Sequence, residues 1–305
     1  MKEDFTSILL DGFATWRNNP WICVPFILDF LAVIVFSILY FIAVILVLGI
    51  LGFGVFSLFS SGQPEGMQNL APHLMGGLVI ALIIVLALVL VYYIITILIT
   101  SFFTAGAIGM SKEAIEKNKT SVSTMIDYGR RKMMSLFAVN VIISLVYLLA
   151  VVIIVGVFIG VPIMLGFSLG GDGLMGFLFI LPGLLLLILC LIVLSIVFAP
   201  VQYALVLSDL RTIDGLKRGV SFFLENKLFV FLLWLIISMI SIFVEVLNLI
   251  YRFAVEQLPT ILSLIMSFTG LLIYLVVLLV VVTPLFTVWW SRLYLARTGT
   301  GDSIY

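Results

Sequence analysis

Six long, almost uncharged apolar runs constrain the fold of this chain more than any other feature of its sequence. They cover residues 21–50, 77–104, 133–165, 177–207, 228–250 and 260–291. A helix needs about 20 apolar residues to cross the hydrocarbon core of a bilayer, and each run is long enough to do so. The runs are continuously apolar and do not alternate, which favours helices over the strands of a membrane barrel. The sequence therefore predicts an all-α integral membrane protein with six transmembrane helices.

The composition excludes the soluble classes of protein. Of the 305 residues, 64% are apolar and only 10% are charged, whereas an ordinary soluble domain has about 25% charged residues. A soluble fold of this length could not bury so much hydrocarbon. Fifteen basic residues balance fifteen acidic ones, so the net charge indicates no nucleic-acid partner. We expect the partners to be membrane lipids, together with a second copy of the chain or another membrane protein.

The basic residues are distributed very unevenly between the two sides of a six-span chain. Fourteen of the fifteen lie on one side, in the segments 1–20, 111–132 and 208–227 and in the tail after the last run. Arg252 is the only Lys or Arg in the loops on the opposite side. Short loops rich in Lys and Arg remain in the cytoplasm. We therefore expect a multi-pass protein of the cell membrane with both termini in the cytoplasm.

The three cytoplasmic segments that precede pairs of spans resemble one another, which indicates an internal repeat. Apolar residues recur every three or four positions around 5–16, 112–128 and 209–224, a spacing typical of an amphipathic helix. The sequence predicts one membrane domain over 1–305 that contains three helical hairpins, each preceded by an interfacial amphipathic helix. The repeat units would be approximately 1–104, 105–207 and 208–305.

Two local features accompany the predicted repeat. Gly12, Trp16 and Asn19 in the first unit have the same spacing as Gly219, Phe223 and Asn226 in the third. Basic residues beside the apolar stripes suit anionic lipid headgroups. The candidates for headgroup contact are Arg130, Arg131, Lys132, Lys217 and Arg218.

Three segments carry a resemblance to a known family. They are AGAIGMSKEAIEKNKTSVSTMIDYGRRK (105–132), SDLRTIDGLKRGVSFFLENKLFVF (208–231) and LLDGFATWRNNPWICVPF (9–26). These segments resemble an uncharacterised family of archaeal multi-pass proteins, which is similar in turn to the membrane domain of bacterial glycerophosphodiester phosphodiesterases. The resemblance implies the fold and a role in the membrane. It implies no active site, because the phosphodiesterase chemistry belongs to a separate soluble domain for which this chain has no residues.

A few polar side chains lie within the predicted spans, where polar groups are costly and are candidates for function. Asp29 lies about 12 Å beyond the cytoplasmic entry of the first span, at 1.5 Å per residue. Asn140 and Trp234 lie at similar depths in the third and fifth spans, so the three side chains could form one polar layer. Such a layer would either fix helix packing through hydrogen bonds or hold a carboxylate that responds to protons or a ligand.

A second polar group lies near the outer end of the fifth span. Glu245, Asn248 and Arg252 are spaced so that one helix face can hold all three. They form either a charge cluster that ends the helix or a gate or external ligand site.

Two apolar runs are longer than a bilayer requires. Residues 21–59 and 133–171 would each span about 58 Å as a helix, against about 30 Å of hydrocarbon. Each must tilt, project beyond the outer face or break at its glycines.

The sequence contains no HExxH metal-binding motif and no P-loop, and we expect no enzyme activity, no cofactor and no metal. The favoured function is a non-enzymatic membrane scaffold or lipid-interacting protein. The alternative is a small channel or transporter that uses a buried polar site around Asp29.

Overall fold

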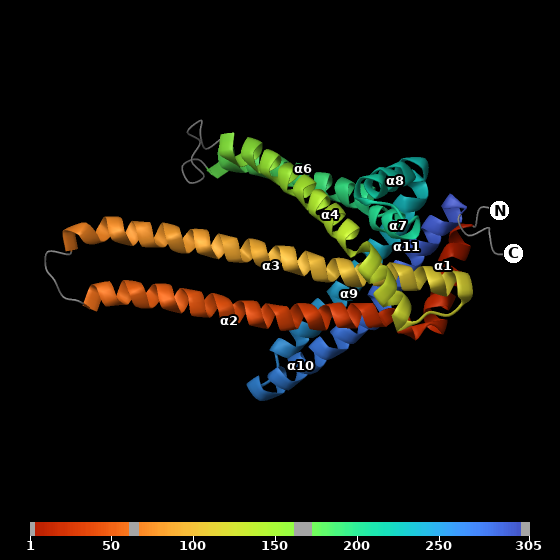
Figure 1. Cartoon of the computed structure of the whole chain (residues 1–305), viewed down its shortest axis with the longest axis horizontal. Coiled ribbons are helices and arrows are strands. Elements are labelled where there is room, and N and C mark those ends of the chain that lie inside the picture. The colour runs from red at the N-terminus through yellow and green to blue at the C-terminus, as the bar shows by residue number, and fades with distance from the viewer. Residues whose placement is uncertain (1–3, 61–66, 162–172, 300–305) are drawn as a thin grey trace. The chain divides into compact units, whose positions relative to one another are not determined.

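Helices make up almost all of the computed structural model, which describes residues 4–60, 67–161 and 173–299 (Figure 1). The first helices are α1 (Phe5–Asn18), a short 3-10 helix (Pro20–Cys23), α2 (Val24–Ser60), α3 (Met67–Lys117) and α4 (Val122–Val155), followed by a π-helical turn (Gly156–Gly160). The later helices are α6 (Gly173–Phe198), α7 (Val201–Leu207), α8 (Thr212–Glu225), α9 (Lys227–Glu256), α10 (Thr260–Val276), a π-helical turn (Val277–Val282) and α11 (Thr283–Thr298). No strand occurs within these described ranges.

Six helical segments are long and apolar enough to cross a membrane, which confirms the predicted number of spans. They are Pro20–Gly49, Leu82–Lys117, Val122–Gly160, Ile180–Leu207, Lys227–Glu256 and Thr260–Thr298. The chain is therefore a multi-pass membrane protein. Its large exposed apolar side chains are suited to contact with lipid.

The two over-long apolar runs differ in outcome. Helix α2 continues for 37 residues, about 56 Å, through the glycines near residue 50, so a break at those glycines is wrong. Helix α3 is longer still, at 51 residues. The second run passes from α4 into the π-helical turn Gly156–Gly160, and residues 162–171 lie outside the described part of the chain.

The chain divides into two compact units, of which Leu28–Thr100 is the smaller. Within this unit, α2 and α3 pack through an aromatic and hydroxyl contact. The hydroxyl groups of Ser37 and Tyr92 are 2.9 Å apart, and the Tyr92 ring lies 4.6 Å from that of Tyr40 and 5.5 Å from that of Phe36. Hydrogen bonds between side chains of neighbouring helices contribute to helix association in a bilayer.

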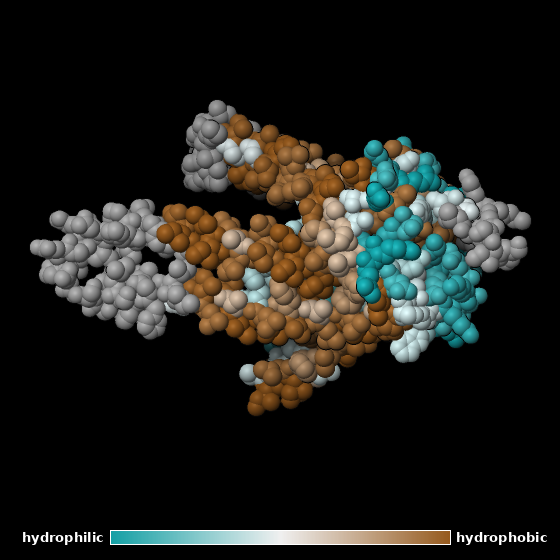
Figure 2. Space-filling model, viewed as in Figure 1, coloured by the Kyte–Doolittle hydropathy of each residue, from teal (hydrophilic) through white to brown (hydrophobic). Residues whose placement is uncertain are grey.

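The larger unit has its buried core at one end of its helices. Ile8, Leu136, Leu205, Phe222 and Tyr294 are almost fully buried there, and they come from α1, α4, α7, α8 and α11. Hydrophilic residues cover this end over α7 and α8, whereas α4 and α6 are hydrophobic along most of their lengths (Figure 2). The packed end is thus the polar end, and the apolar stretches lie away from it.

Two of the three predicted amphipathic segments are separate helices, and the sequence shows why each ends where it does. The Asn19 amide donates to the Thr15 carbonyl at the end of α1, and the Asn226 amide donates to the Phe222 carbonyl at the end of α8. Each amide supplies a donor that the last turn of a helix lacks. Both segments therefore form helices, and α8 begins at Thr212, three residues after the predicted start at 209.

The middle segment corrects the prediction. Residues 112–128 are not one helix, because α3 continues to Lys117 and α4 begins at Val122. Gly129 corresponds to Gly12 and Gly219, but the residue seven positions later is Leu136 where the other units have asparagine. With no capping amide at that position, the helix continues into the span.

Three corresponding glycines allow close packing at the polar end. A Cβ atom at Gly12 would lie 2.5 Å from the Trp289 side chain of α11, and one at Gly129 would lie 2.7 Å from Phe102 of α3. A Cβ atom at Gly219 would lie 2.5 Å from the Val201 backbone of α7. Gly129 and Gly219 thus each face the end of the span that precedes them in the chain. Gly12 faces the last span of the chain.

Besides the packing of Gly12 on Trp289, hydrogen bonds join the first helix to the last span near Pro284. Pro284 has no N–H and directly follows the π-helical turn Val277–Val282 and Thr283, so the carbonyls of this turn have one backbone donor fewer. The Trp16 indole donates to the Val280 carbonyl of this turn at 3.1 Å, and the Trp289 indole donates to the Leu9 carbonyl at 3.0 Å. These bonds join α1 to the last span.

We predict that Gly219→Ala destabilises the fold by about 1–3 kcal/mol, because the new methyl group must displace the Val201 backbone. Thermal unfolding in detergent micelles would measure this as a lower melting temperature. The control is Gly49→Ala, because Gly49 has no atom within 4 Å of an added Cβ. Equal melting temperatures for Gly219→Ala and the unchanged protein would contradict the close packing.

Candidate functional site

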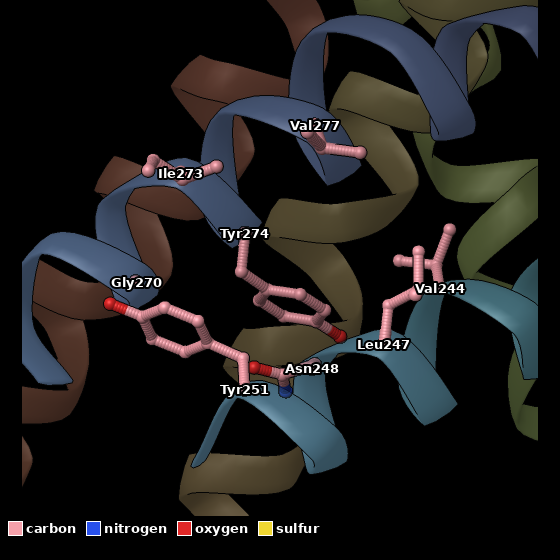
Figure 3. A pocket seen from close by; sticks show the side chains of 8 residues that line it. All are labelled: Val244, Leu247, Asn248, Tyr251, Gly270, Ile273, Tyr274 and Val277. Atoms are coloured by element: carbon pink, nitrogen blue, oxygen red, sulfur yellow. The ribbon is translucent and has the colours of Figure 1, made fainter. Parts of the chain in front are cut away.

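Two adjoining pockets lie between α9 and α10, close to the short connection between these helices. The first is an apolar cavity of about 300 Å³. Its lining residues are Val244, Leu247, Asn248, Tyr251, Gly270, Ile273, Tyr274 and Val277 (Figure 3). The volume is at the lower end of the range for small-molecule sites, about 300–1,000 Å³.

The second pocket is more polar and has a volume of about 310 Å³. It is lined by Asn248, Tyr251, Arg252, Glu256, Ser267, Gly270, Leu271 and Tyr274. Four residues line both pockets, namely Asn248, Tyr251, Gly270 and Tyr274. Together the two form one site with an apolar part and a polar part.

Two tyrosines line both parts of this site, and each is held by a hydrogen bond. The Tyr251 hydroxyl donates to the Met266 carbonyl at 2.7 Å, and the Tyr274 hydroxyl donates to the Glu245 carboxylate at 2.5 Å. A Cβ atom at Gly270 would lie only 2.0 Å from the Tyr251 ring. Glycine at position 270 therefore gives Tyr251 the room to lie against α10 (Figure 3).

The two charged residues of the polar part, Arg252 and Glu256, have no ionic partner within the described residues. Arg252 and Glu256 lie one helical turn apart on α9, and both are exposed. Neither forms an ion pair or a side-chain hydrogen bond within the described residues, although both line the same pocket. A ligand in this pocket would meet one unpaired cation and one unpaired anion.

The sequence located part of this site. Asn248 and Arg252 line it, and Glu245 lies behind it, where its carboxylate fixes the Tyr274 hydroxyl. Sequence reasoning missed Tyr251 and Gly270. A glycine within the apolar run 260–291 was the available signal, but its tyrosine partner depends on the register between α9 and α10.

Asp29 lies in the smaller unit, where the Thr100 side chain is its hydrogen-bonding neighbour. Within the described residues, one carboxylate oxygen of Asp29 is buried without a hydrogen-bond partner, and so is the Thr96 hydroxyl oxygen one turn before Thr100. Thr100, which lies on α3, is thus a polar neighbour of Asp29 within this unit.

Asn140 and Trp234 lie in the larger unit, each with its own surroundings. The Asn140 amide donates to the Ser101 hydroxyl at 3.2 Å and accepts from the Gln202 amide at 3.1 Å. Trp234 packs against the hydrophobic core of the larger unit, and its indole makes no hydrogen bond in the part of the chain that is described. Gln202 is the residue that the sequence analysis did not anticipate.

The five basic residues proposed for headgroup contact fall into two groups. Lys132 is buried and binds the Asp209 carboxylate and the Leu210 carbonyl, both at 2.9 Å, so it stabilises the protein interior rather than facing lipid. Arg131 also lies near Asp209, at 3.5 Å, and Arg218 pairs with Glu225 at 3.4 Å. Arg130 and Lys217 are exposed and form no ion pair within the described residues.

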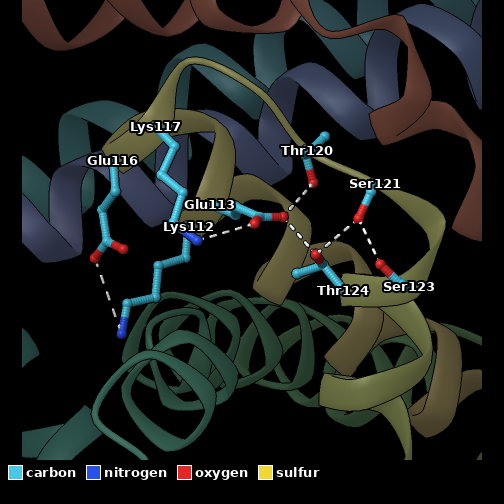
Figure 4. Close-up of polar contacts among 8 residues, drawn as sticks. All are labelled: Lys112, Glu113, Glu116, Lys117, Thr120, Ser121, Ser123 and Thr124. Carbon is cyan, nitrogen blue, oxygen red and sulfur yellow. Dashed lines mark hydrogen bonds and ion pairs between the residues drawn. The ribbon is translucent and has the colours of Figure 1, made fainter.

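A carboxylate holds the turn between α3 and α4. Glu113 pairs with Lys117 at 3.2 Å and accepts hydrogen bonds from Thr120 and Thr124 (Figure 4). The turn contains Asn118 at φ 55°, a left-handed conformation that asparagine tolerates. This network is therefore structural.

A second carboxylate holds the turn between α7 and α8. The hydrogen bond and charge of Lys132, with the charge of Arg131, lower the pKa of Asp209 below its ordinary value. Asp209 has φ 56°, and Lys112 donates to the Leu207 carbonyl at the end of α7 at 3.3 Å. Two lysines thus fix this turn.

Comparisons with known proteins give a family and no activity. Residues 93–296 match the family described as Domain of unknown function (DUF7847). An uncharacterized protein from Archaeoglobus fulgidus is 24% identical over 317 residues, and the alignment covers 99% of each chain. No solved structure matches this chain.

We predict that Asp209→Asn lowers the melting temperature at about pH 7, with the difference shrinking as the pH falls below about 4, the ordinary range of an aspartate pKa. A lowered pKa in the folded state stabilises the protein above the ordinary aspartate pKa, and the stabilisation is lost as the pH falls through the lowered value. Asparagine tolerates the same positive φ, so the change removes the charge and leaves the turn. A pH-independent difference between the two proteins would contradict this role of the Lys132 pair.

Proposed function

Since this chain belongs to the family described as Domain of unknown function (DUF7847), we propose its function from geometry: it is a non-enzymatic, lipid-binding membrane protein. The site is the pair of pockets between α9 and α10. The likeness to the membrane domain of glycerophosphodiester phosphodiesterases adds a role in the membrane and no hydrolytic chemistry. No paired acid and base lies in the described pockets to perform hydrolysis.

One observation carries this proposal: the apolar and polar pockets share four lining residues. A membrane lipid also has an apolar part joined to a polar part. Hydrocarbon suits the cavity beside Val244, Leu247 and Ile273, whereas a headgroup suits the side chains beside Arg252 and Glu256. The site opens on helices whose neighbouring apolar side chains are exposed, as lipid contact requires.

The proposed topology places this site on the outer side of the cell membrane and both termini in the cytoplasm. The uneven distribution of basic residues supports it. We further propose that α1 and α8 lie in the plane of the inner interface. Leu10 and Phe13 on α1, and Ile213 and Leu224 on α8, expose apolar side chains opposite the buried glycines.

The same inner surface would attract anionic lipid. The exposed cations of this surface that form no ion pair within the described residues are Arg17, Lys119, Arg130, Arg211, Lys217 and Lys227. Each such cation adds about 1 kcal/mol of attraction to an anionic membrane. A scaffold that also binds partners would use this surface.

The three units proposed from the sequence receive support from the packing at the polar end. The contacts of Gly12, Gly129 and Gly219 join each unit's first segment to the last span of another unit. With hairpins as the repeated element, these contacts would close a ring in the order one, two, three, one.

A channel or transporter is the second candidate, and the environment of Asp29 favours it. A buried carboxylate oxygen and the buried Thr96 hydroxyl both lack partners among the described residues. Water, a proton or a small cation would satisfy these atoms.

The lipid site is tested by filling the apolar pocket. We predict that Val244→Phe with Ile273→Phe lowers the amount of lipid retained after purification in detergent about tenfold, as expected for losing about 1.4 kcal/mol of hydrocarbon burial. Native mass spectrometry measures the retained lipid. The matched control is Ile242→Phe with Leu272→Phe, which adds the same groups to exposed positions outside both pockets. Equal lipid retention by the two double variants would refute the proposal.

The topology is tested with single cysteines after Cys23 and Cys190 are replaced by serine. We predict that a membrane-impermeant maleimide labels a cysteine at Ser267, in the outer polar pocket, in intact cells. A cysteine at Ser221 on α8 should be labelled only after the cells are opened. The opposite pattern would invert the topology.

A further inference from the structure

The lipid site carries an unusual arrangement of charge at its polar end. Arg252 and Glu256 are four residues apart on α9, so their Cβ atoms are about 6 Å apart on one face. They nevertheless form no ion pair with each other, and both line the polar pocket. The other carboxylate nearby, Glu245, is already engaged by the Tyr274 hydroxyl.

From this arrangement we infer that the polar pocket selects a zwitterionic lipid headgroup, with its phosphate on Arg252 and its cationic nitrogen on Glu256. This inference rests on the proposed lipid binding and names the class of lipid. The guanidinium group matches a phosphate through two parallel N–H donors. The Glu256 carboxylate matches an ammonium group one helical turn away.

The other headgroup classes fit the same residues less well. An anionic headgroup without a cationic nitrogen would satisfy Arg252 but would place its negative charge near Glu256, which repels it. An uncharged headgroup would leave both side chains without an ionic partner. Only a headgroup with both charges satisfies Arg252 and Glu256 at once.

Two uncharged groups complete the polar pocket. The Asn248 amide and the Ser267 hydroxyl line it and have no side-chain hydrogen bond within the described residues. Both lie where a lipid carries its ester, ether or hydroxyl oxygens, between headgroup and hydrocarbon. Asn248 lines the apolar pocket as well, which places it at that junction.

The test uses the full-length protein in detergent with three lipids that have identical chains. Phosphatidylcholine is zwitterionic, phosphatidylglycerol is anionic and diacylglycerol is uncharged. Native mass spectrometry gives the fraction of protein with one lipid bound at equal lipid concentrations. We expect phosphatidylcholine to bind about tenfold more tightly than either of the others, the ratio expected for one charge-assisted hydrogen bond.

Three variants assign that preference to the two charges. Glu256→Gln should remove the preference for phosphatidylcholine over phosphatidylglycerol, and Arg252→Gln should remove the preference for phosphatidylcholine over diacylglycerol. The control is Gln257→Ala, since Gln257 is exposed but lines neither pocket, and it should retain both preferences. All three positions are exposed, so we expect the variants to fold.

The possible outcomes separate this inference from the proposal beneath it. Equal binding of the three lipids, abolished by Val244→Phe with Ile273→Phe, would support a lipid site and overturn zwitterion selection. Preferences that persist in both Arg252→Gln and Glu256→Gln would also overturn it. If the pocket-filling variant binds every lipid as well as the unchanged protein, then the lipid site itself is refuted.

Discussion

The hydrogen bond from the Trp16 indole to the Val280 carbonyl is the contact on which the larger unit depends. Val280 lies in a π-helical turn just before Pro284, which supplies no backbone donor, inside a segment that is otherwise apolar. An unsatisfied carbonyl costs several kcal/mol in hydrocarbon, so the last span needs the first helix beside it. Gly12 lets α1 approach closely enough for the Trp289 indole to make a second bond.

This contact places the organised core at the polar end and leaves the apolar helices free for lipid. Helices in a bilayer gain little from burying leucine against leucine, because acyl chains are equally apolar. Close packing therefore occurs where glycines, indoles and charged side chains meet, as at Gly219 and at the buried Lys132. Away from that end, α9 and α10 meet through Tyr251 and Gly270 and enclose the pockets.

The sequence predicted what depends on position along the chain alone. The six spans followed from the length of hydrocarbon, and the group Glu245, Asn248 and Arg252 followed from helical spacing. The sequence failed to predict the middle amphipathic segment. Leu136 stands where the other two units have a capping asparagine, so α4 continues into the span. The sequence also could not foresee the pockets, because Tyr251 and Gly270 meet only through the register between two helices.

The rule that orients the chain also identifies Arg252 as exceptional. Short outer loops are poor in Lys and Arg, and Arg252 is the single Lys or Arg of the sequence on the proposed outer side. A cation retained only to cap α9 would be expected to bind the helix's last carbonyls or Glu256, and within the described residues it binds neither. An exposed cation beside an equally unpaired anion, above an apolar cavity, is the arrangement that a headgroup with both charges would favour.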